Sequence, residues 1–165
     1  MMRSLQKAPM RKILLRDELE EIVARLKSEG KKIVFTNGCF DLLHVGHVRY
    51  LKEARSLGDI LIIGLNSDTS VKRLKPQRPI NEESMRAEVL ASLEAVDYVT
   101  IFSEDTPYEL IKSVGPDVLV KGGDWKKEDI VGSDIVAEVH SLPYVAGVST
   151  TGIIEKMLSS KESKH

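Results

Sequence analysis

Short apolar runs recur between residues 33 and 120, and each is about as long as a β-strand. Most positions in each run are apolar, whereas a strand with one face in water would alternate, so we expect helices to cover both faces of the sheet. The runs therefore predict strands in a buried parallel sheet. They are Ile33–Phe35, Ile60–Ile63, Tyr98–Ile101 and Val118–Val120.

Segments with helical spacing separate these runs. The first begins near Asp17 and stops at Gly30. It forms an amphipathic leading helix, whose apolar positions are Leu19, Ile22, Val23 and Leu26. A second helix, with Val48, Leu51 and Ala54 on its apolar side, stops at Gly58.

Two more helices have recognisable ends. Asn81 can cap a helix that carries Met85, Val89 and Leu93 at apolar positions. The capping box Thr106–Glu109, with proline at the first helical position, opens another helix, which ends at Gly115.

The alternation of strands and helices predicts an α/β fold: a single Rossmann-like domain with a parallel sheet and helices on both faces. We expect it to span residues 16–165, after an N-terminal arm of residues 1–15. Segment 134–143 is short for a further helix and strand, although His140 falls in a strand-like stretch. Ligands of such folds bind at the carboxyl ends of the strands, so we expect the chemistry there.

Charge and cysteine content exclude several classes of protein. The chain has 165 residues, with 24 basic and 25 acidic side chains, which disfavours nucleic acid as a partner. A single cysteine cannot form an internal disulfide, and no stretch is apolar for long enough to span a membrane. We therefore expect a cytoplasmic protein.

The first strand leads into two histidines, His44 and His47, with Gly46 between them at the start of a helix. The free N–H groups and the positive end of a helix favour an anion, and Gly46 lets a phosphate approach the backbone. Such donors suit phosphoryl transfer. The alternative is that these residues are a helix cap and an ordinary surface histidine.

Two further segments could bind a nucleotide. Ser149, Thr150 and Thr151 offer hydroxyl and N–H donors at the start of the last helix, although capping alone would explain them. Gly122 and Gly123 follow a strand and would let a base lie against the backbone, or form only a tight turn. Beside them, Asp124 is a candidate for ribose or base, and Trp125 is either a substrate contact or a core ring.

The sequence predicts no dedicated protein site for a metal ion. It lacks a cysteine pair and a His-Glu-x-x-His spacing, and the remaining histidines are His140 and His165. We still expect Mg²⁺, held mainly by phosphate oxygens of the substrate.

Four blocks of the sequence resemble a known family. Residues 36–51 contain a His-x-Gly-His motif similar to that of the cytidylyltransferase-like nucleotidyltransferases, and together the blocks resemble heptose 1-phosphate adenylyltransferases (ADP-heptose synthases). The other blocks are Arg78–Asn81 with Arg86–Leu90, Val120–Trp125, and Ser149–Ile154. The likeness extends from Lys12 to Leu158.

The resemblance implies roles for individual residues. His44 and His47 would stabilise the α-phosphate in the transition state, Lys75 would neutralise phosphate charge, and Arg86 would contact phosphate. Asp41 would either help bind the divalent ion or orient its loop, and we prefer orientation. Nucleotide and phosphate contacts are expected from Thr36, Asn37, Gly38, Phe40, Gly46, Arg86, Gly122, Gly123, Asp124, Ser149, Thr150 and Thr151, and substrate contacts from Asp41, Asn66, Arg78 and Trp125.

The implied reaction joins AMP from ATP to heptose 1-phosphate and releases pyrophosphate. The acceptor phosphate is itself the nucleophile, so we interpret Cys39 as a packed residue rather than a catalytic one. Many relatives are fused to a sugar kinase for which this chain is too short, and we expect a separate heptose kinase. The sequence allows a homodimer without indicating an interface.

Two alternatives remain. One is a cytidylyltransferase acting on glycerol 3-phosphate or a similar alcohol phosphate, since the same motifs serve both. The other is a nucleotide-binding regulatory module without turnover. Pyrophosphate release distinguishes the enzymes from the module, and the choice of nucleotide distinguishes the enzymes from each other.

Overall fold

The computed structural model describes residues 9–162, and its core is a five-stranded parallel sheet with strand order β3-β2-β1-β4-β5. The four predicted strands are confirmed, and the strand-like stretch around His140 is the fifth. The strands are β1 (Ile33–Gly38), β2 (Ile60–Asn66), β3 (Tyr98–Phe102), β4 (Val118–Gly122) and β5 (Glu138–Leu142).

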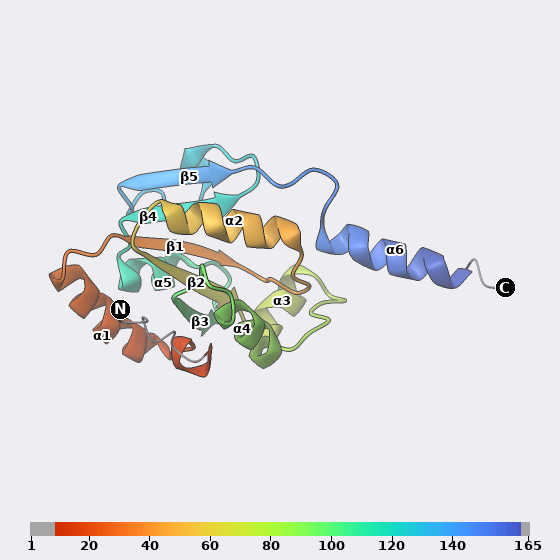
Figure 1. Ribbon diagram of the computed structural model, residues 1–165, viewed down its shortest axis with the longest axis horizontal. Coiled ribbons are helices and arrows are strands. Elements are labelled where there is room, and N and C mark those ends of the chain that lie inside the picture. Colours follow the sequence, from red (N-terminus) through yellow and green to blue (C-terminus); the bar gives the residue numbers. More distant parts are fainter. Residues whose placement is uncertain (1–8, 163–165) are drawn as a thin grey trace, which may run out of the picture.

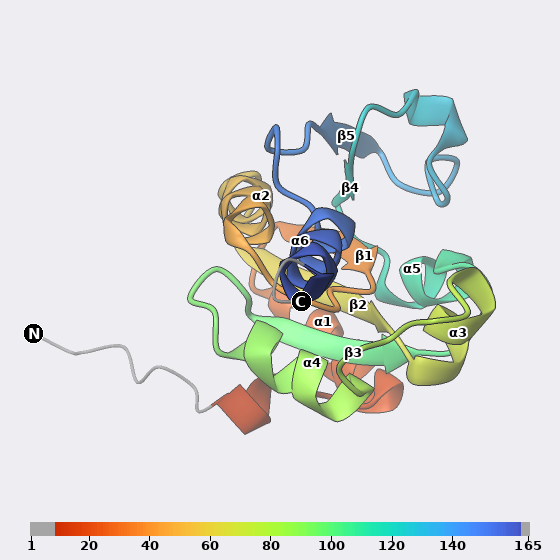
Figure 2. The ribbon, with the colours of Figure 1, turned by 90° about the vertical axis from the view of Figure 1, so that its right-hand side faces the viewer.

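Helices cover both faces of this sheet, as the apolar runs predicted (Figures 1 and 2). On one face α1 and α5 enclose a core with β1, β2 and β3, and on the other α2 and α4 enclose a second core. The helices are α1 (Arg16–Ser28), α2 (Val45–Ser56), α3 (Asp68–Leu74), α4 (Glu83–Ala91), α5 (Tyr108–Val114) and α6 (Thr150–Glu162), with short 3₁₀ turns η1 (Pro9–Lys12) and η2 (Lys127–Asp129).

Helix α4 turns a different face to the core from the one expected. Met85 and Val89 are 54% and 50% exposed, whereas Ala87, Leu90 and Ala91 are buried. Small alanines let the helix lie close to the sheet, so the wider Met85–Val89 side faces outward. Asn81 is not the cap, because Glu82 holds that position and the Asn81 side chain donates to the Asp41 carbonyl instead.

Other ends differ slightly from the prediction. The α5 helix begins at Tyr108, with Pro107 as its N-cap, and ends in a left-handed Gly115 as expected. Helix α3 was not predicted, because it buries only Ser70 and Val71 and so has no apolar period.

Part of the expected N-terminal arm lies against the sheet. The Leu14 N–H donates to the Val99 carbonyl at 2.9 Å, and Ile13 bridges to Val99 at the outer edge of β3. The Lys12 ammonium donates to the Leu93 and Val96 carbonyls. Residues 1–8 of the arm are outside the described part.

Strand order reverses between β1 and β4, which are neighbours in the sheet. A ligand of an open α/β sheet binds beside such a point, at the carboxyl ends of the strands. The loops after β1 and β4 lie there, and α6 emerges from the same end and extends away from the body (Figure 1). Within residues 9–162, no helix has both the length and the apolar character needed to cross a membrane.

Candidate active site

Both histidines of the motif lie in the first turn of α2, as predicted. His44 is the N-cap and His47 is the third helical residue. Their rings stack with centroids 3.9 Å apart and an interplanar angle of 30°. The pair therefore forms one unit at the positive end of the helix.

Backbone hydrogen bonds determine which ring nitrogen of each histidine carries the proton. The His44 Nδ1 accepts from the Gly46 N–H at 3.1 Å, and the His47 Nδ1 accepts from the His44 N–H at 3.3 Å. A neutral imidazole that accepts at Nδ1 carries its proton on Nε2. Each ring thus presents an Nε2–H donor, and neither donor has a protein partner among the described residues.

Both rings are neutral in the free protein. Burial lowers the pKa of His44. The pKa of His47 is lowered to about 4 by burial and, to a smaller extent, by the neighbouring His44. In this state the two rings offer neutral hydrogen-bond donors rather than fixed positive charges.

The His44 ring leaves no room for a side chain at position 46, which explains the glycine there. A Cβ at this position would lie 2.9 Å from the His44 Nδ1, closer than real Cβ contacts. Phe40 has a similar supporting position: its backbone is left-handed with φ of 45°, and its ring packs 5.4 Å from the His47 ring. Since Phe40 is only 8% exposed, the geometry supports a positioning role rather than nucleotide contact.

Asp41 joins the histidine loop to the loop before α4. Its carboxylate accepts from the Ile80 and Asn81 N–H groups, and Arg78 lies 3.5 Å from it. With 6% exposure and these partners, Asp41 is held as the orienting residue that we preferred from sequence. Arg78 also donates to the Thr151 hydroxyl at 3.4 Å, which connects the same loop to α6.

The start of α6 lies next to the histidine loop. Ser149 Oγ caps the helix by accepting from the Gly152 N–H at 2.9 Å, and the Thr150 hydroxyl donates to the Leu42 carbonyl at 3.1 Å. The positive ends of α2 and α6 are therefore brought together from positions about a hundred residues apart in the sequence. Two such helix ends favour a polyanion.

Two lysines lie near Cys39, at the carboxyl end of β1. Burial raises the pKa of the Cys39 thiol, and Lys75 and Lys121 both act against that rise. Neither lysine has an ion-pair partner in the described chain. The thiol is thus protonated, and the two cations are available for an anion.

Lys121 was not among the site residues predicted from sequence, although a charged residue at the end of a buried strand could have indicated it. It is half-buried on β4, its ammonium lies 5.6 Å from the centroid of the Trp125 ring, and burial lowers its pKa. Lys75, by contrast, is exposed just after α3.

Aromatic rings surround the glycine turn after β4. A Cβ on Gly122 would lie 3.2 Å from Tyr144 and 3.4 Å from Tyr50, and the left-handed Gly123 faces Trp125 and Tyr144. Trp125 and Tyr144 are 48% and 75% exposed, so they are rim residues and not core. No sequence pattern pointed to Tyr144.

Four further predicted residues lie at the carboxyl edge of the sheet. The buried Thr36 hydroxyl bonds to Tyr50 Oη at 2.6 Å. Asn37 and Gly38 are half-buried at the end of β1, and Asp124 is exposed in the glycine turn. Of these four residues, Thr36 already has its hydroxyl hydrogen-bonded within the protein.

Arg86 and Asn66 are held inside the protein. Arg86 is 2% exposed, and its guanidinium donates to the carbonyls of Asn81, Cys39 and Asn66 and to the Asp68 carboxylate. The Asn66 amide donates to the Ser70 hydroxyl. We therefore revise both expectations: Arg86 braces the ends of β1, β2 and α4 rather than binding phosphate, and Asn66 is part of that brace.

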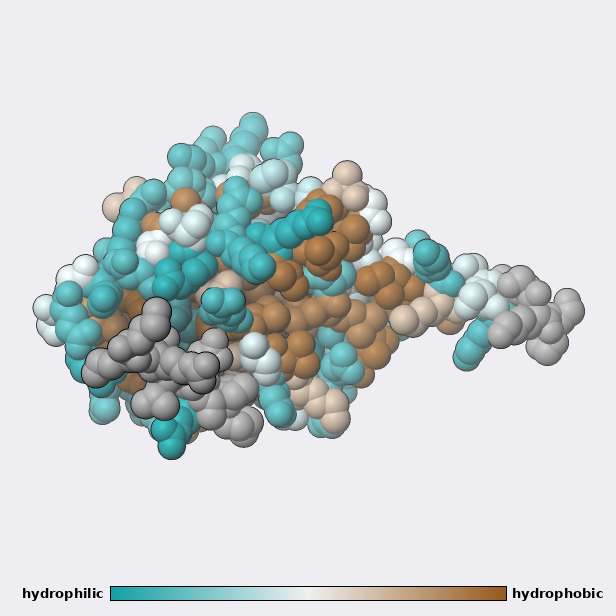
Figure 3. Space-filling model, viewed as in Figure 1, coloured by the Kyte–Doolittle hydropathy of each residue, from teal (hydrophilic) through white to brown (hydrophobic). Residues whose placement is uncertain are grey.

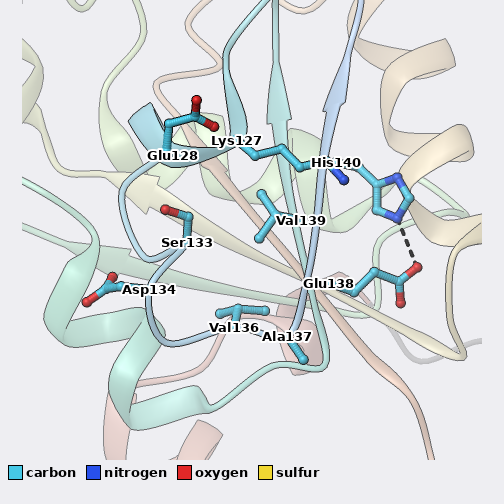
Figure 4. A pocket seen from close by; sticks show the side chains of 9 residues that line it. All are labelled: Lys127, Glu128, Ser133, Asp134, Val136, Ala137, Glu138, Val139 and His140. Atoms are coloured by element: carbon cyan, nitrogen blue, oxygen red, sulfur yellow. Dashed lines mark hydrogen bonds and ion pairs between the residues drawn. The ribbon is translucent and has the colours of Figure 1, made fainter.

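An open pocket at the β5 edge lies apart from the candidate active site. It is lined by residues 127–140 and contains none of the predicted site residues (Figure 4). Its His140 is paired with Glu138 at 2.9 Å, and Glu138 is also paired with Lys32. In the described chain, no three His, Cys, Asp or Glu residues gather as metal ligands.

Comparison with known proteins agrees with this geometry. A family model described as cytidylyltransferase-like matches residues 35–156. The bifunctional protein HldE of a Nitratiruptor species is 60% identical over 159 residues, which cover 95% of this chain and 34% of that protein. HldE of Aliarcobacter butzleri is 58% identical, over 88% of this chain and 31% of that protein. The chain thus spans about a third of the length of these relatives.

Two solved structures share the fold. The lipopolysaccharide core biosynthesis protein from Thermoplasma volcanium is 30% identical with a TM-score of 0.61, covering 70% of this chain and 99% of that one. Pantoate-beta-alanine ligase from Francisella tularensis, complexed with beta-gamma ATP and beta-alanine, has a TM-score of 0.59 at 18% identity, over 86% of this chain and 75% of that one, and shows the fold alone. The family match over most of the chain and the high identity to the HldE proteins lead to one conclusion: this chain is a nucleotidyltransferase of the cytidylyltransferase-like family.

Proposed function

We propose that the chain joins AMP from ATP to D-glycero-D-manno-heptose 1-phosphate, giving ADP-heptose and pyrophosphate. The observation that carries the proposal is the His44–His47 pair, which presents two Nε2–H donors at the start of α2, while Thr150 at the start of α6 is bonded to Leu42 in the loop before these histidines. The high identity to bifunctional HldE proteins supports the choice of heptose phosphate.

The histidine donors would hold the α-phosphate. Negative charge grows on its oxygens as the pyrophosphate leaves, and donors already in position stabilise that charge without rearrangement. The N–H groups and hydroxyls of Ser149, Thr150 and Thr151 would bind the β- and γ-phosphates at the positive end of α6.

Lys75 and Lys121 would bind the phosphate of the acceptor. Both lysines act electrostatically on the Cys39 thiol, and neither has an ion-pair partner in the described chain, so their charges are available for a phosphate dianion. An oxygen of the sugar phosphate then attacks the α-phosphorus, a new P–O bond forms, and the bond to the pyrophosphate breaks on the opposite side.

The nucleotide base would lie at the rim formed by Trp125 and Tyr144. Both rings are exposed and lie next to Gly123, so a purine could stack on either. Asp124, which is exposed in the same turn, would accept hydrogen bonds from the ribose hydroxyls.

Magnesium would enter with ATP. The one buried carboxylate near the histidines, Asp41, already accepts from two backbone N–H groups, and no ligand cluster is found among the described residues. These residues fit an ion held by phosphate oxygens and water rather than by the protein. When bound, the ion would offset negative charge on the phosphates.

A heptose kinase would supply the acceptor, and the product would enter the synthesis of lipopolysaccharide or another heptose-containing glycan. The description of the Thermoplasma structure as a lipopolysaccharide core biosynthesis protein supports that destination. Both ATP and the sugar phosphate point to the cytoplasm.

The test is pyrophosphate release by the purified chain with Mg²⁺, using ATP or CTP against heptose 1-phosphate or glycerol 3-phosphate. We expect release with ATP and heptose 1-phosphate alone. Release only with CTP and glycerol 3-phosphate would refute the substrate assignment, and nucleotide binding without any release would refute the enzymatic one.

A further inference from the structure

Trp125 is an exposed aromatic residue that the protein nevertheless holds in one position. Its indole Nε1–H donates to the Gly122 carbonyl at 3.1 Å, and its backbone N–H donates to the Ser141 hydroxyl at 3.0 Å. The Ser141 hydroxyl in turn donates to the Gly123 carbonyl. Strand β5 thus fixes the glycine turn and the turn fixes the ring, although Trp125 is 48% exposed.

An apolar surface does not account for this ordered ring. On the face of the molecule shown in Figure 3, mainly hydrophilic side chains cover the edge of the sheet that carries β4 and β5. Ordering a side chain costs conformational entropy, which burial normally offsets. A ring that is ordered while half of it stays in water therefore indicates a role beyond packing.

The Trp125 ring also supports the ammonium of Lys121. The Lys121 Nζ lies over the ring, 5.6 Å from its centroid, a distance at which an aromatic face attracts a cation. Lys121 is the register partner of Ser141 between β4 and β5, so the residue that holds the turn stands beside this lysine. Burial lowers the pKa of Lys121, because a half-buried cation has lost part of its water. The ring face offsets part of that loss.

Two parts of the proposed reaction therefore meet at one side chain. The candidate position of the base is the exposed surface of the ring, and the candidate position of the acceptor phosphate is the ammonium over the ring. A base stacked on the indole would restrict the ring further, and the ring would then restrict the ammonium. The acceptor phosphate would have less conformational freedom to remove when it binds.

We propose that Trp125 is a positioning residue for the acceptor phosphate: its ring carries the Lys121 ammonium on one face and receives the nucleotide base on the other. Nucleotide binding fixes the cation that the acceptor phosphate meets, so each substrate raises the affinity for the other by the same factor. This inference rests on the proposed function for the use of a nucleotide and a phosphorylated acceptor, but not for the identity of the sugar.

Isothermal titration calorimetry of the whole chain with Mg²⁺ measures the coupling. The affinity for heptose 1-phosphate is determined alone and with an ATP analogue that cannot be cleaved between its α- and β-phosphates. We expect the analogue to lower the dissociation constant about fivefold, at the lower end of ordinary coupling between sites. The coupling should disappear in Trp125→Leu and remain largely intact in Trp125→Phe, which keeps an aromatic face without the Nε1–H.

Variants of the cation separate the coupling from damage to the turn. Lys121→Met leaves the hydrogen bonds of Trp125 in place, yet it should abolish the coupling and also weaken binding of the acceptor alone. Lys126→Met, on the exposed loop next to the ring, is the matched control and should keep the coupling of the wild type. Circular dichroism verifies that each variant is folded.

Tryptophan fluorescence provides a second test, because Trp125 is the one tryptophan in the sequence. Inorganic phosphate has neither a base nor a sugar, so we expect it to affect the ring only through the ammonium. Saturating phosphate should change the emission of the wild type and of Lys126→Met but not that of Lys121→Met. No change in the wild type, or the same change in Lys121→Met, would overturn the inference.

Failure of the inference and failure of the proposed function give different results. If heptose 1-phosphate does not bind while phosphate still changes the emission through Lys121, the proposed acceptor is wrong and the inference stands. If heptose 1-phosphate is a substrate but its affinity ignores the analogue, or the coupling survives Trp125→Leu, the inference is overturned and the proposed function stands. Equal loss of coupling in Trp125→Phe and Trp125→Leu would also overturn it, because the hydrogen bond to Gly122 would then matter rather than the ring face.

Discussion

At the scale of single residues, the proton positions of His44 and His47 determine which ring atoms can donate a hydrogen bond to a phosphate. Because both Nδ1 atoms accept backbone N–H groups, each ring can offer only its Nε2–H to a phosphate. A lowered pKa keeps both rings neutral before ATP binds. The catalytic contribution that we propose for them is therefore directional hydrogen bonding, which a cation elsewhere would not replace.

Replacing His44 by asparagine should separate the two roles of this side chain, which caps α2 through Nδ1 and offers a hydrogen-bond donor at Nε2. Asparagine is among the best N-cap residues, so His44→Asn keeps an acceptor for the Gly46 N–H and should leave the free energy of unfolding nearly unchanged. It removes the Nε2–H, and kcat should fall on the order of a hundredfold to a thousandfold. Steady-state pyrophosphate release measures this, and a kcat close to that of the wild type would contradict the assigned role.

Lys121 gives a second prediction for a single residue. Lys121→Met keeps the buried carbon chain but removes the charge that we assign to the acceptor phosphate. A hydrogen bond to a charged group contributes about 1.5–3 kcal/mol, so KM for the sugar phosphate should rise roughly tenfold to a hundredfold. KM for ATP should change much less. Lys126→Met, on the exposed loop after β4, is the control, and equal effects of Lys121→Met on both substrates would contradict the assignment.

At the scale of elements, Arg86 determines how the ends of β1, β2 and α4 are held together. Its guanidinium bonds to three backbone carbonyls and one carboxylate from elements far apart in the sequence. A phosphate-binding arginine needs free donors, whereas here four hydrogen bonds engage them. The role is therefore structural, and it acts on the site by holding Cys39 and Asn81.

Removing that brace should reduce stability more than substrate binding. Arg86→Ala leaves buried carbonyls without donors and Asp68 without its partner, which typically costs about 3–5 kcal/mol. Urea unfolding measures the loss, and Arg73→Ala, which breaks a surface pair with Asp105, should cost no more than about 1 kcal/mol. If Arg86→Ala kept full stability and lost only ATP binding, the original sequence expectation would be right.

The elements also show how far sequence patterns could predict this molecule. Strands β1 to β4 were predictable because nearly every position is apolar, a pattern that only a doubly covered strand explains. The outward face of α4 was not, because Met85 and Val89 are spaced as regularly as Ala87 and Ala91, and packing of the small side chains decided between them. Tyr144 reaches the glycine turn only through tertiary folding, so nothing local indicated it.

At the scale of the whole molecule, the sheet brings together the ends of α2 and α6 and the loops after β1 and β4. The strand order could be limited from sequence by the rule on parallel connections, and the site was expected at the carboxyl ends. What the sequence did not contain was the Asp41–Arg78–Thr151 chain of contacts, because Asp41 and Arg78 come from two different loops and Thr151 from the first turn of α6. These contacts join two loops and a helix into one site, so the stability of the fold and the state of the site are linked.

The free energy of unfolding should also depend on pH through His47, which lies in the same site. Its pKa is about 4 in the folded chain and about 6.5 in the unfolded chain, so the unfolded state binds more protons between these values. The free energy of unfolding should therefore be unaffected by His47 above about pH 6.5 and should fall as the pH drops from 6.5 towards 4.

His47→Gln isolates this effect, because glutamine at the third helical position can still accept from the N-cap backbone but does not titrate. Glu104 and Glu138, whose pKa values are lowered by their partners Arg16 and His140, lose their stabilising effect at lower pH in both proteins, so they cancel in the difference. Urea unfolding from pH 7.5 to pH 4 should show a steeper decline for the wild type than for the variant. Parallel curves would mean that His47 is as easily protonated in the folded chain as in the unfolded one, and they would refute the lowered pKa that we assign to this ring.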